Sequence, residues 1–239
     1  MHPYDAFAAA YGKAGFHGFS RKIGKRLAHR WRKLLPVDAL IADLGAGDGG
    51  AVEAFTSQGF RVVGLDRSFG MVMRNPGLCV QGDMRQLPFR PGFDGVVSLY
   101  DAVNHVPPPD LPAFFAEVAG ILQPGGLFAF DANTYDGTRM WTGQTFVVEE
   151  PEVFLEVSSQ YDRATRKLVN TVHGWVREGN QHVPIDDCIE EWYHPRNHLT
   201  RVAGRAGFAL VAEDPLFMDE NVPGKPSKWL FEMERVGEA

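Results

Sequence analysis

The chain contains 239 residues, of which 44% are hydrophobic and 23% charged, and its formal net charge is −6. These ordinary globular values exclude a disordered chain, a collagen-like fibre and a disulfide-stapled miniprotein. The two cysteines, Cys79 and Cys188, are far apart, which fits a reducing compartment. The sequence has no signal-peptide pattern and no 18-residue apolar run, so we expect a cytoplasmic protein that does not contact membranes.

The charge is unevenly distributed along the chain. Residues 1–35 carry eight Lys and Arg side chains and a single acid, Asp5, whereas the remainder carries a net charge of −13. Such a basic segment on an acidic body indicates either an anionic partner or an ordinary solvated helix face, and we favour the helix face.

The first 138 residues alternate between helical and strand patterns. Apolar residues recur at helical spacing over 17–35, which predicts an amphipathic helix ended by Pro36. Further helices are expected near 50–58 and 68–74 and from Asp110, as N-cap, to about 122. Strands are expected at 39–42, 61–65, 78–80, 93–99 and 127–130, the last after a turn at 123–126. This alternation predicts an α/β protein with a doubly wound parallel sheet.

The pattern changes after residue 139. Alternating strands at 144–160, 167–178 and 181–193 predict an antiparallel segment. A helix at 197–206 and two closing strands at 208–211 and 229–234 follow, with a Pro/Gly-rich loop at 215–226 between those strands. We therefore expect one domain formed by 1–138 and 195–239, with 139–194 inserted as a substrate cap or dimer face.

A glycine-rich turn follows the first predicted strand. Gly45, Gly47 and Gly50 have the G-x-G-x-x-G spacing, at which the backbone approaches a ligand closely. A nicotinamide dinucleotide would place its pyrophosphate here, but the carboxylates of Asp43 and Asp48 would repel it. They would suit S-adenosylmethionine, which carries an ammonium and a sulfonium.

Residues 41–49, Ile-Ala-Asp-Leu-Gly-Ala-Gly-Asp-Gly, closely resemble the first motif of the class I S-adenosylmethionine-dependent methyltransferases. The resemblance extends over about 41–131 and includes Leu-Gln-Pro-Gly-Gly at 122–126. It implies a Rossmann-like, mostly parallel seven-stranded sheet, with S-adenosylmethionine as methyl donor and S-adenosylhomocysteine as product. It also implies that Asp66 binds the ribose hydroxyls, that Asp83 receives the adenine amino group, and that Met84 packs on the adenine ring.

The cofactor residues expected from this resemblance come from several strand ends. They are Tyr11, Asp43, Gly45, Ala46, Gly47, Asp66, Arg67, Asp83, Met84, Leu99 and Tyr100. Tyr4, Asp5 and Tyr11 resemble the start of enzymes in which an aromatic lid closes on the cofactor. The alternative is that both tyrosines only pack the first helix.

The segment 98–106 follows the fourth strand, where the methyl acceptor lies in this family. It lacks the Asn/Asp-Pro-Pro-Tyr/Phe signature of nucleic-acid amino methyltransferases and resembles small-molecule enzymes, including those acting on amino sugars. His105 is the first candidate for a general base, because histidine exchanges protons near neutral pH. Asp101 and Asn104 are the alternatives, and a histidine that only packs is a further possibility.

The inserted strands are rich in aromatic residues that predict an acceptor pocket, a local core or a dimer face. They are Trp141, Phe146, Tyr161, Trp175, Trp192 and Tyr193. His194 and His198 are separated by Pro195 and lack a third ligand, so we expect no metal.

The leading hypothesis is a small-molecule N- or O-methyltransferase that acts as a monomer or homodimer. The alternatives are a tRNA or rRNA methyltransferase that uses the basic helix to bind phosphates, an NAD-dependent oxidoreductase, and a catalytically silent cofactor-binding protein. Neither the acceptor nor the need for a base follows from the sequence.

Overall fold

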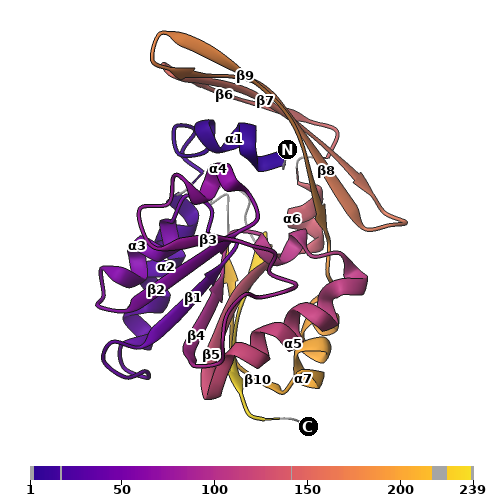
Figure 1. Ribbon diagram of the computed structural model, residues 1–239. Coiled ribbons are helices and arrows are strands. Elements are labelled where there is room, and N and C mark those ends of the chain that lie inside the picture. The colour runs from indigo at the N-terminus through magenta and orange to yellow at the C-terminus, as the bar shows by residue number, and fades with distance from the viewer. Residues whose placement is uncertain (1–2, 17, 141, 217–224, 238–239) are drawn as a thin grey trace.

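The computed structural model describes residues 3–16, 18–140, 142–216 and 225–237. The chain forms a central seven-stranded sheet covered by helices and a separate four-stranded sheet beyond one end of it (Figure 1). Within the described ranges, no helix is both long and apolar enough to cross a membrane.

The central sheet has the strand order β3-β2-β1-β4-β5-β11-β10. Its strands are β1 (Leu40–Leu44), β2 (Arg61–Asp66), β3 (Cys79–Gln81), β4 (Phe93–Ser98), β5 (Leu122–Asn133), β10 (Phe208–Leu216) and β11 (Lys228–Arg235). The first five pair in parallel, whereas β11 runs antiparallel to both β5 and β10. The predicted mostly parallel, doubly wound sheet is confirmed. Its strand order reverses between β1 and β4, where open sheets of this kind bind ligands.

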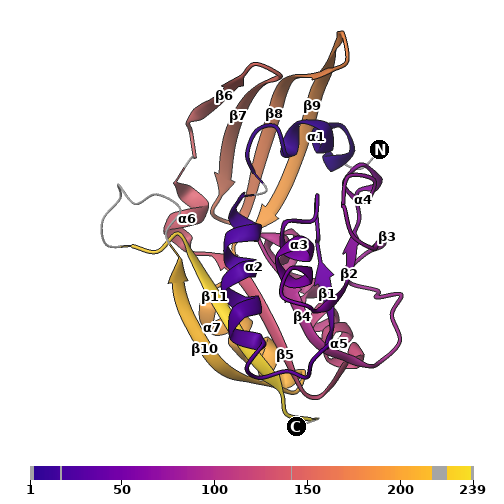
Figure 2. The same cartoon turned by 90° about the vertical axis from the view of Figure 1, so that its left-hand side faces the viewer.

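Helices cover both faces of the sheet (Figures 1 and 2). On one face lie α2 (Gly18–Trp31) and α3 (Gly50–Thr56), whose apolar side chains form a core with β1, β4 and β5. On the other face lie α5 (Leu111–Ile121) and α7 (Arg196–Arg205), packed around Phe114, Phe115 and Phe128. Both faces of β1, β4 and β5 are therefore buried, which explains their continuous apolar runs.

Several element boundaries differ from the sequence predictions, and β10 extends to Leu216 instead of ending at residue 211. The first long helix ends at Trp31 and continues as turns to Leu35, short of Pro36. The fifth strand begins at Leu122 instead of Leu127, because buried Leu122 already pairs with Phe93. The register then shifts before Gly95 pairs with Leu127, and Gly125 has a φ of 78°. The predicted turn is therefore an irregularity within β5.

The second sheet is antiparallel, with the order β6-β7-β8-β9. Its strands are β6 (Thr145–Glu150), β7 (Val153–Asp162), β8 (Lys167–Glu178) and β9 (Gln181–Trp192), and the short helix α6 (Tyr135–Arg139) precedes them. The predicted strand at 144–160 is two strands, because a turn at Pro151 and Glu152 divides it. A proline cannot donate a ladder hydrogen bond, so it favours a break here.

The N-terminal helix α1 (Pro3–Tyr11) connects the two sheets and lies between them in Figure 1. Its apolar side packs on Leu155, Val172 and Ile189 of the second sheet. The Phe7 amide donates to Asp187 of β9 at 2.9 Å. The Asp5 carboxylate accepts from Ser68 Oγ at 2.7 Å, at the start of α4 (Phe69–Val72). The helix α1 is thus hydrogen-bonded to the second sheet on one side and to the start of α4 on the other.

The basic segment pairs with the acidic body. On α2, Arg21 forms an ion pair with Glu53, Arg26 with Asp214, and Arg30 with both Asp214 and Glu232. These acids come from α3, β10 and β11. These three arginines of the basic segment are therefore paired with acids of the body, which agrees with an ordinary helix face.

Trp31→Ala should lower the free energy of unfolding by about 3–5 kcal/mol. Trp31 is fully buried, its ring lies 5.4 Å from that of Phe55, and its Nε1 donates to Glu232 at 3.1 Å. Urea unfolding measures the change. Leu34→Ala, at a side chain 61% exposed, is the control and should cost less than about 0.5 kcal/mol. Equal losses in the two variants would contradict the packing assignment.

Candidate active site

The glycine turn after β1 is built by close backbone contacts. Gly45 and Gly47 have φ values of 76° and 54°, a region that favours glycine. The amides of Gly45 and Ala46 donate to the Leu65 carbonyl at 2.8 and 3.0 Å. A Cβ on Gly45 would lie 2.6 Å from Cβ of Ala102. The turn therefore requires glycine at position 45 for both conformation and space.

Asp66 at the end of β2 stabilises this turn. One carboxylate oxygen accepts the Gly47 amide and the other accepts the Ser68 amide, both at 2.8 Å. Burial raises the pKa of Asp66, and these two amide hydrogen bonds oppose the rise. Each carboxylate oxygen has a second acceptor direction. Asp66 can thus hold the turn and accept hydrogen bonds from two ligand hydroxyls.

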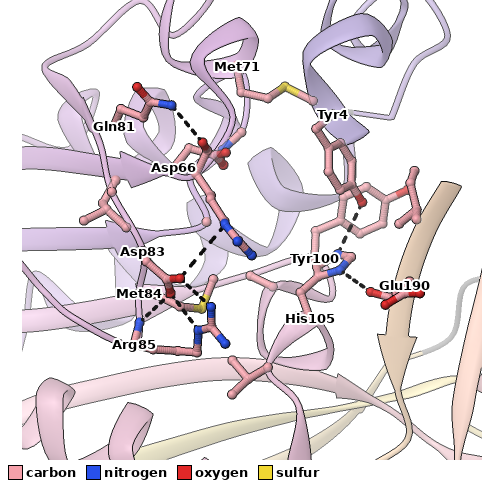
Figure 3. A pocket seen from close by; sticks show the side chains of 18 of the residues that line it. Tyr4, Asp66, Met71, Gln81, Asp83, Met84, Arg85, Tyr100, His105 and Glu190 are labelled. Atoms are coloured by element: carbon pink, nitrogen blue, oxygen red, sulfur yellow. Dashed lines mark hydrogen bonds and ion pairs between the residues drawn. The ribbon is translucent and has the colours of Figure 1, made fainter. Parts of the chain in front are cut away.

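A cavity of about 850 Å³ opens beside these groups (Figure 3). Its walls come from α1, the glycine turn, the ends of β2 and β3, the segment after β4, and β9 of the second sheet. Its volume lies near the upper end of the range for small-molecule sites. The carboxyl ends of the strands, the helix α1 and the second sheet therefore enclose one site.

A small pocket of about 30 Å³ adjoins the cavity and shares Tyr11, Gly45, Gly47 and Tyr100 with it. Asp43 lies there, only 2% exposed. One of its carboxylate oxygens has no hydrogen-bond partner among the described residues. Burial, and secondarily the charge of Asp66, raises the pKa of Asp43 to about 7. A buried oxygen without a partner marks a place for a donor or a cation.

Asp83 and Met84 line the cavity after β3. The Asp83 carboxylate accepts from Arg85 Nε at 2.9 Å and from Arg85 Nη2 at 2.6 Å. The Arg85 hydrogen bonds lower the pKa of Asp83. Arg85 also donates to Asp110, whose side chain does not cap α5 as predicted. The sequence reasoning missed Arg85, although an arginine two residues after an acid can reach back to it.

His105 belongs to the short 3₁₀ helix η1 (Ala102–His105) and lies between Tyr4 and Glu190 in Figure 3. Its Nδ1 is 2.8 Å from the Glu190 carbonyl oxygen, and its Nε2 is 3.2 Å from the Tyr4 hydroxyl. A carbonyl oxygen can only accept, so Nδ1 carries the proton in the neutral ring. The Nε2 atom is then the basic atom, and the Tyr4 hydroxyl donates to it.

Residues 42–130 match the family described as a methyltransferase domain. A putative methyltransferase of Bacillus subtilis, YqeM, is 23% identical over 239 aligned residues, which cover 92% of this chain and 97% of that protein.

A solved S-adenosylmethionine-dependent methyltransferase of Clostridium acetobutylicum superposes with a TM-score of 0.82 at 19% identity, covering 98% of this chain and 99% of that one. Residues 42–130 therefore correspond to a methyltransferase domain, and the chain as a whole has the fold of solved S-adenosylmethionine-dependent methyltransferases. CalS10 of Micromonospora echinaspora, an amino pentose methyltransferase, superposes with a TM-score of 0.67 at 21% identity, covering 90% and 91% of the two chains.

The structure places the predicted cofactor residues of this methyltransferase around the two connected spaces. Tyr11, Gly45, Gly47, Asp66, Arg67, Asp83, Met84 and Tyr100 line the larger cavity. Asp43, Ala46 and Leu99 line the small pocket. Their assignment to particular cofactor atoms stays a prediction.

Two of the three catalytic candidates do not line the cavity. Asp101 forms an ion pair with buried Lys228. Asn104 is 1% exposed, donates to the Trp192 carbonyl at 2.8 Å and accepts the Asn133 amide at 3.0 Å. The expectation that they face the acceptor is therefore corrected, because long-range partners draw both side chains away. Of the three, only His105 lines the cavity.

The inserted strands contribute one wall of the cavity. Among the predicted aromatic residues, Trp192 lines it together with Cys188, Ile189 and Glu190, which the sequence reasoning missed. Phe146 packs in the core of the second sheet. Tyr161 and Tyr193 gather around Tyr135, and Trp175 packs on Phe154 and His182. Trp141 lies outside the described residues.

His194 and His198 have protein partners. Nε2 of buried His194 donates to the Val106 carbonyl at 3.0 Å, and burial lowers the pKa of His194 to about 4. His198 Nδ1 accepts from Arg201 at 3.2 Å. No group of three His, Cys, Asp or Glu residues suited to a metal occurs in the described part of the chain.

Asp43→Asn should stabilise the ligand-free protein at pH 8. The folded-state pKa of Asp43 lies about three units above the ordinary aspartate value, so folding favours the protonated carboxyl. Wild-type stability is therefore lost as pH rises from about 4 through 7, which corresponds to at most about 4 kcal/mol. The gain from Asn should be largest at pH 8 and vanish near pH 4. Urea unfolding of both proteins across this range measures it, and a pH-independent difference would contradict the assignment.

Proposed function

We propose that this methyltransferase transfers a methyl group from S-adenosylmethionine to an amine or hydroxyl group of a small molecule. The observation that carries the proposal is the unpartnered carboxylate oxygen of Asp43, buried in a pocket beside a cavity of about 850 Å³. An ammonium group of the donor would supply the missing partner. A dinucleotide pyrophosphate would instead be repelled by Asp43 and Asp48, which border the same small pocket.

The residues around the two spaces suit the parts of this donor. In the proposal, Asp43 faces the ammonium group and Asp66 accepts the two ribose hydroxyls. Met84 and the Asp83–Arg85 pair border the space for the adenine ring. Asp83 already accepts three hydrogen bonds from Arg85, two from the guanidinium and one from the backbone amide, so its remaining acceptor capacity is directional. The hydrogen bonds that hold Asp66 and Asp83 are present without a bound donor, so binding requires little reorganisation of these side chains.

The reaction expected here is an in-line displacement, in which the sulfonium supplies a good leaving group. The acceptor nitrogen or oxygen forms a bond to the methyl carbon as the carbon–sulfur bond breaks. The protein mainly contributes proximity, alignment and exclusion of water. A protonated acceptor must lose a proton before it attacks, and Nε2 of His105 is the candidate base. The Tyr4 hydroxyl donates to Nε2 in this structure. To act as a base, Nε2 must either break this hydrogen bond and accept the proton directly, or accept the Tyr4 proton while the Tyr4 oxygen takes the proton of the acceptor.

The acceptor side of the cavity favours a small molecule. Tyr4, Tyr100 and Trp192 supply aromatic walls there, and α1 and β9 restrict its size. The similarity to CalS10, an amino pentose methyltransferase, supports an amine acceptor. The pairing of the α2 arginines with Glu53, Asp214 and Glu232 makes an RNA acceptor less favoured.

The donor assignment is tested by thermal shift with S-adenosylhomocysteine and, separately, with NAD. We expect stabilisation by S-adenosylhomocysteine alone, and stabilisation by NAD alone would reject the proposal. Asp66→Ala should weaken S-adenosylhomocysteine binding by about ten- to hundredfold, because it removes charge-assisted hydrogen bonds. Asp186→Ala is the matched control, since that side chain is 82% exposed on β9. Binding of wild-type strength in Asp66→Ala would reject the ribose assignment.

The acceptor is found by screening amines, hydroxy acids and amino sugars for formation of S-adenosylhomocysteine. His105→Ala should then lower turnover by about 100-fold or more while leaving S-adenosylhomocysteine affinity within twofold. The control is His182→Ala, whose ring packs on Trp175 in the second sheet. Unchanged turnover in His105→Ala would remove the base assignment without affecting the donor assignment.

A further inference from the structure

A lysine is enclosed at the start of the C-terminal strand, away from the cofactor-binding residues in the sequence. Lys228 begins β11 and is 1% exposed. Its Nζ donates to Asn133 at 2.8 Å, lies 3.3 Å from Asp131 and forms an ion pair with Asp101. It also lies under the rings of Phe19 and Tyr100, 5.6 and 5.7 Å from their centroids. An ammonium is buried this fully only when it is paired.

The partners of Lys228 hold an unusual turn. Tyr100 and Asp101 are consecutive non-glycine residues with φ values of 60° and 68°. Such left-handed conformations cost free energy and persist only when surrounding contacts impose them. The Asp131 carboxylate accepts both successive amides, from Tyr100 at 2.5 Å and from Asp101 at 3.2 Å.

This turn forms a wall of the proposed active site. The Tyr100 side chain lines both the cavity and the small pocket that contains Asp43. Its ring packs against Phe19 of α2 at 5.1 Å and lies 6.4 Å from Tyr11 of α1. The conformation of the turn therefore determines where the Tyr100 ring stands between the donor pocket and the helix that covers it.

We propose that Lys228 is a positioning residue for methyl transfer, which holds the left-handed Tyr100–Asp101 turn through Asp131 and Asp101 and thereby places the Tyr100 ring against the methyl donor. The inference rests on the proposed function, because the donor must occupy the space that Tyr100 borders. Lys228 itself touches neither the cavity nor the small pocket.

The charge balance explains why a lysine is needed. The Asp131 and Asp101 carboxylates both lie beside Nζ of Lys228. Burial raises the pKa of Asp131, and the charge of Glu191 on β9 raises it further. Without the ammonium, mutual repulsion and burial favour protonation of Asp131. A protonated carboxyl accepts the two amides less well, so the turn loosens.

The test compares S-adenosylhomocysteine affinity in Lys228→Met with that in Lys225→Met, using calorimetry on the full chain. Lys225 is a matched control, three residues earlier, exposed and paired with Asp136. We expect Lys228→Met to weaken binding at least tenfold and Lys225→Met to change it less than twofold. Wild-type affinity in Lys228→Met would overturn the proposal. Absence of binding in the wild type would instead overturn the proposed function.

A second pair of variants separates positioning from general stability. Asp101→Gly removes one carboxylate, and glycine adopts a positive φ without strain. We expect Lys228→Met/Asp101→Gly to recover at least threefold of the affinity lost in Lys228→Met. A double variant that binds as weakly as the single one would overturn the proposal.

Where Lys228→Met does not fold, Asp101→Asn is used. This variant retains the amide that donates to Asp131 but loses the charge that pairs with Lys228. It should weaken S-adenosylhomocysteine binding by about three- to tenfold with a small change in melting temperature. Wild-type affinity in this variant would likewise overturn the proposal.

Discussion

Three acidic side chains are buried at or beside the carboxyl edge of the central sheet, and this burial is the constraint around which the site is organised. Asp43, Asp131 and Glu191 are each at most 9% exposed, and burial raises the pKa of all three. A buried carboxylate is destabilising unless it is paired or hydrogen-bonded. Each acid therefore needs a specific hydrogen-bonding or charged partner, and the three acids differ in how many such partners the chain provides.

Two of the acids have partners within the chain. Glu191 accepts from the side-chain amides of Asn133 and Asn170, at 3.1 and 3.0 Å, and so links β9 to β5 and β8. Asp131 accepts two backbone amides and lies beside Lys228. Asp43 differs, since one of its oxygens has no partner in the described part of the chain. The acid without a full set of partners is also the one that adjoins the proposed donor space. Functional sites keep such unsatisfied groups at a cost in stability.

The sequence predicted the local parts of this arrangement well. The glycine turn, the acids at the ends of β1 and β2 and the five parallel strands all follow from residues close to one another in the chain. Periodicity and turn chemistry act over a few residues, so these features are readable. The boundaries of β5 and the division of β6 from β7 were less accurate, since pairing partners decide them.

The errors concern side chains whose partners are distant in sequence. Asp101 and Asn104 follow β4 as a family loop would, yet Lys228 and the Trp192 carbonyl draw them away from the cavity. The cavity wall from Cys188 to Trp192 could likewise not be predicted in full from the sequence. Strand alternation shows which residues share a face of β9 but not which face meets the central sheet. Local patterns contain no information on contacts made across about 90 to 130 residues, and such contacts decide where a polar side chain points.

Acidic side chains also attach the helix α1 over the cavity, by accepting hydrogen bonds on both of its sides. Asp187 from the second sheet accepts its Phe7 amide, and Asp5 within it accepts from Ser68 and Gly70 near the central sheet. Ser68 in turn donates its amide to Asp66, the acid assigned to the donor ribose. A continuous set of hydrogen bonds thus runs from the second sheet through α1 to Asp66. Donor contacts at Asp66 and attachment of the covering helix therefore depend on the same short segment, residues 66–70.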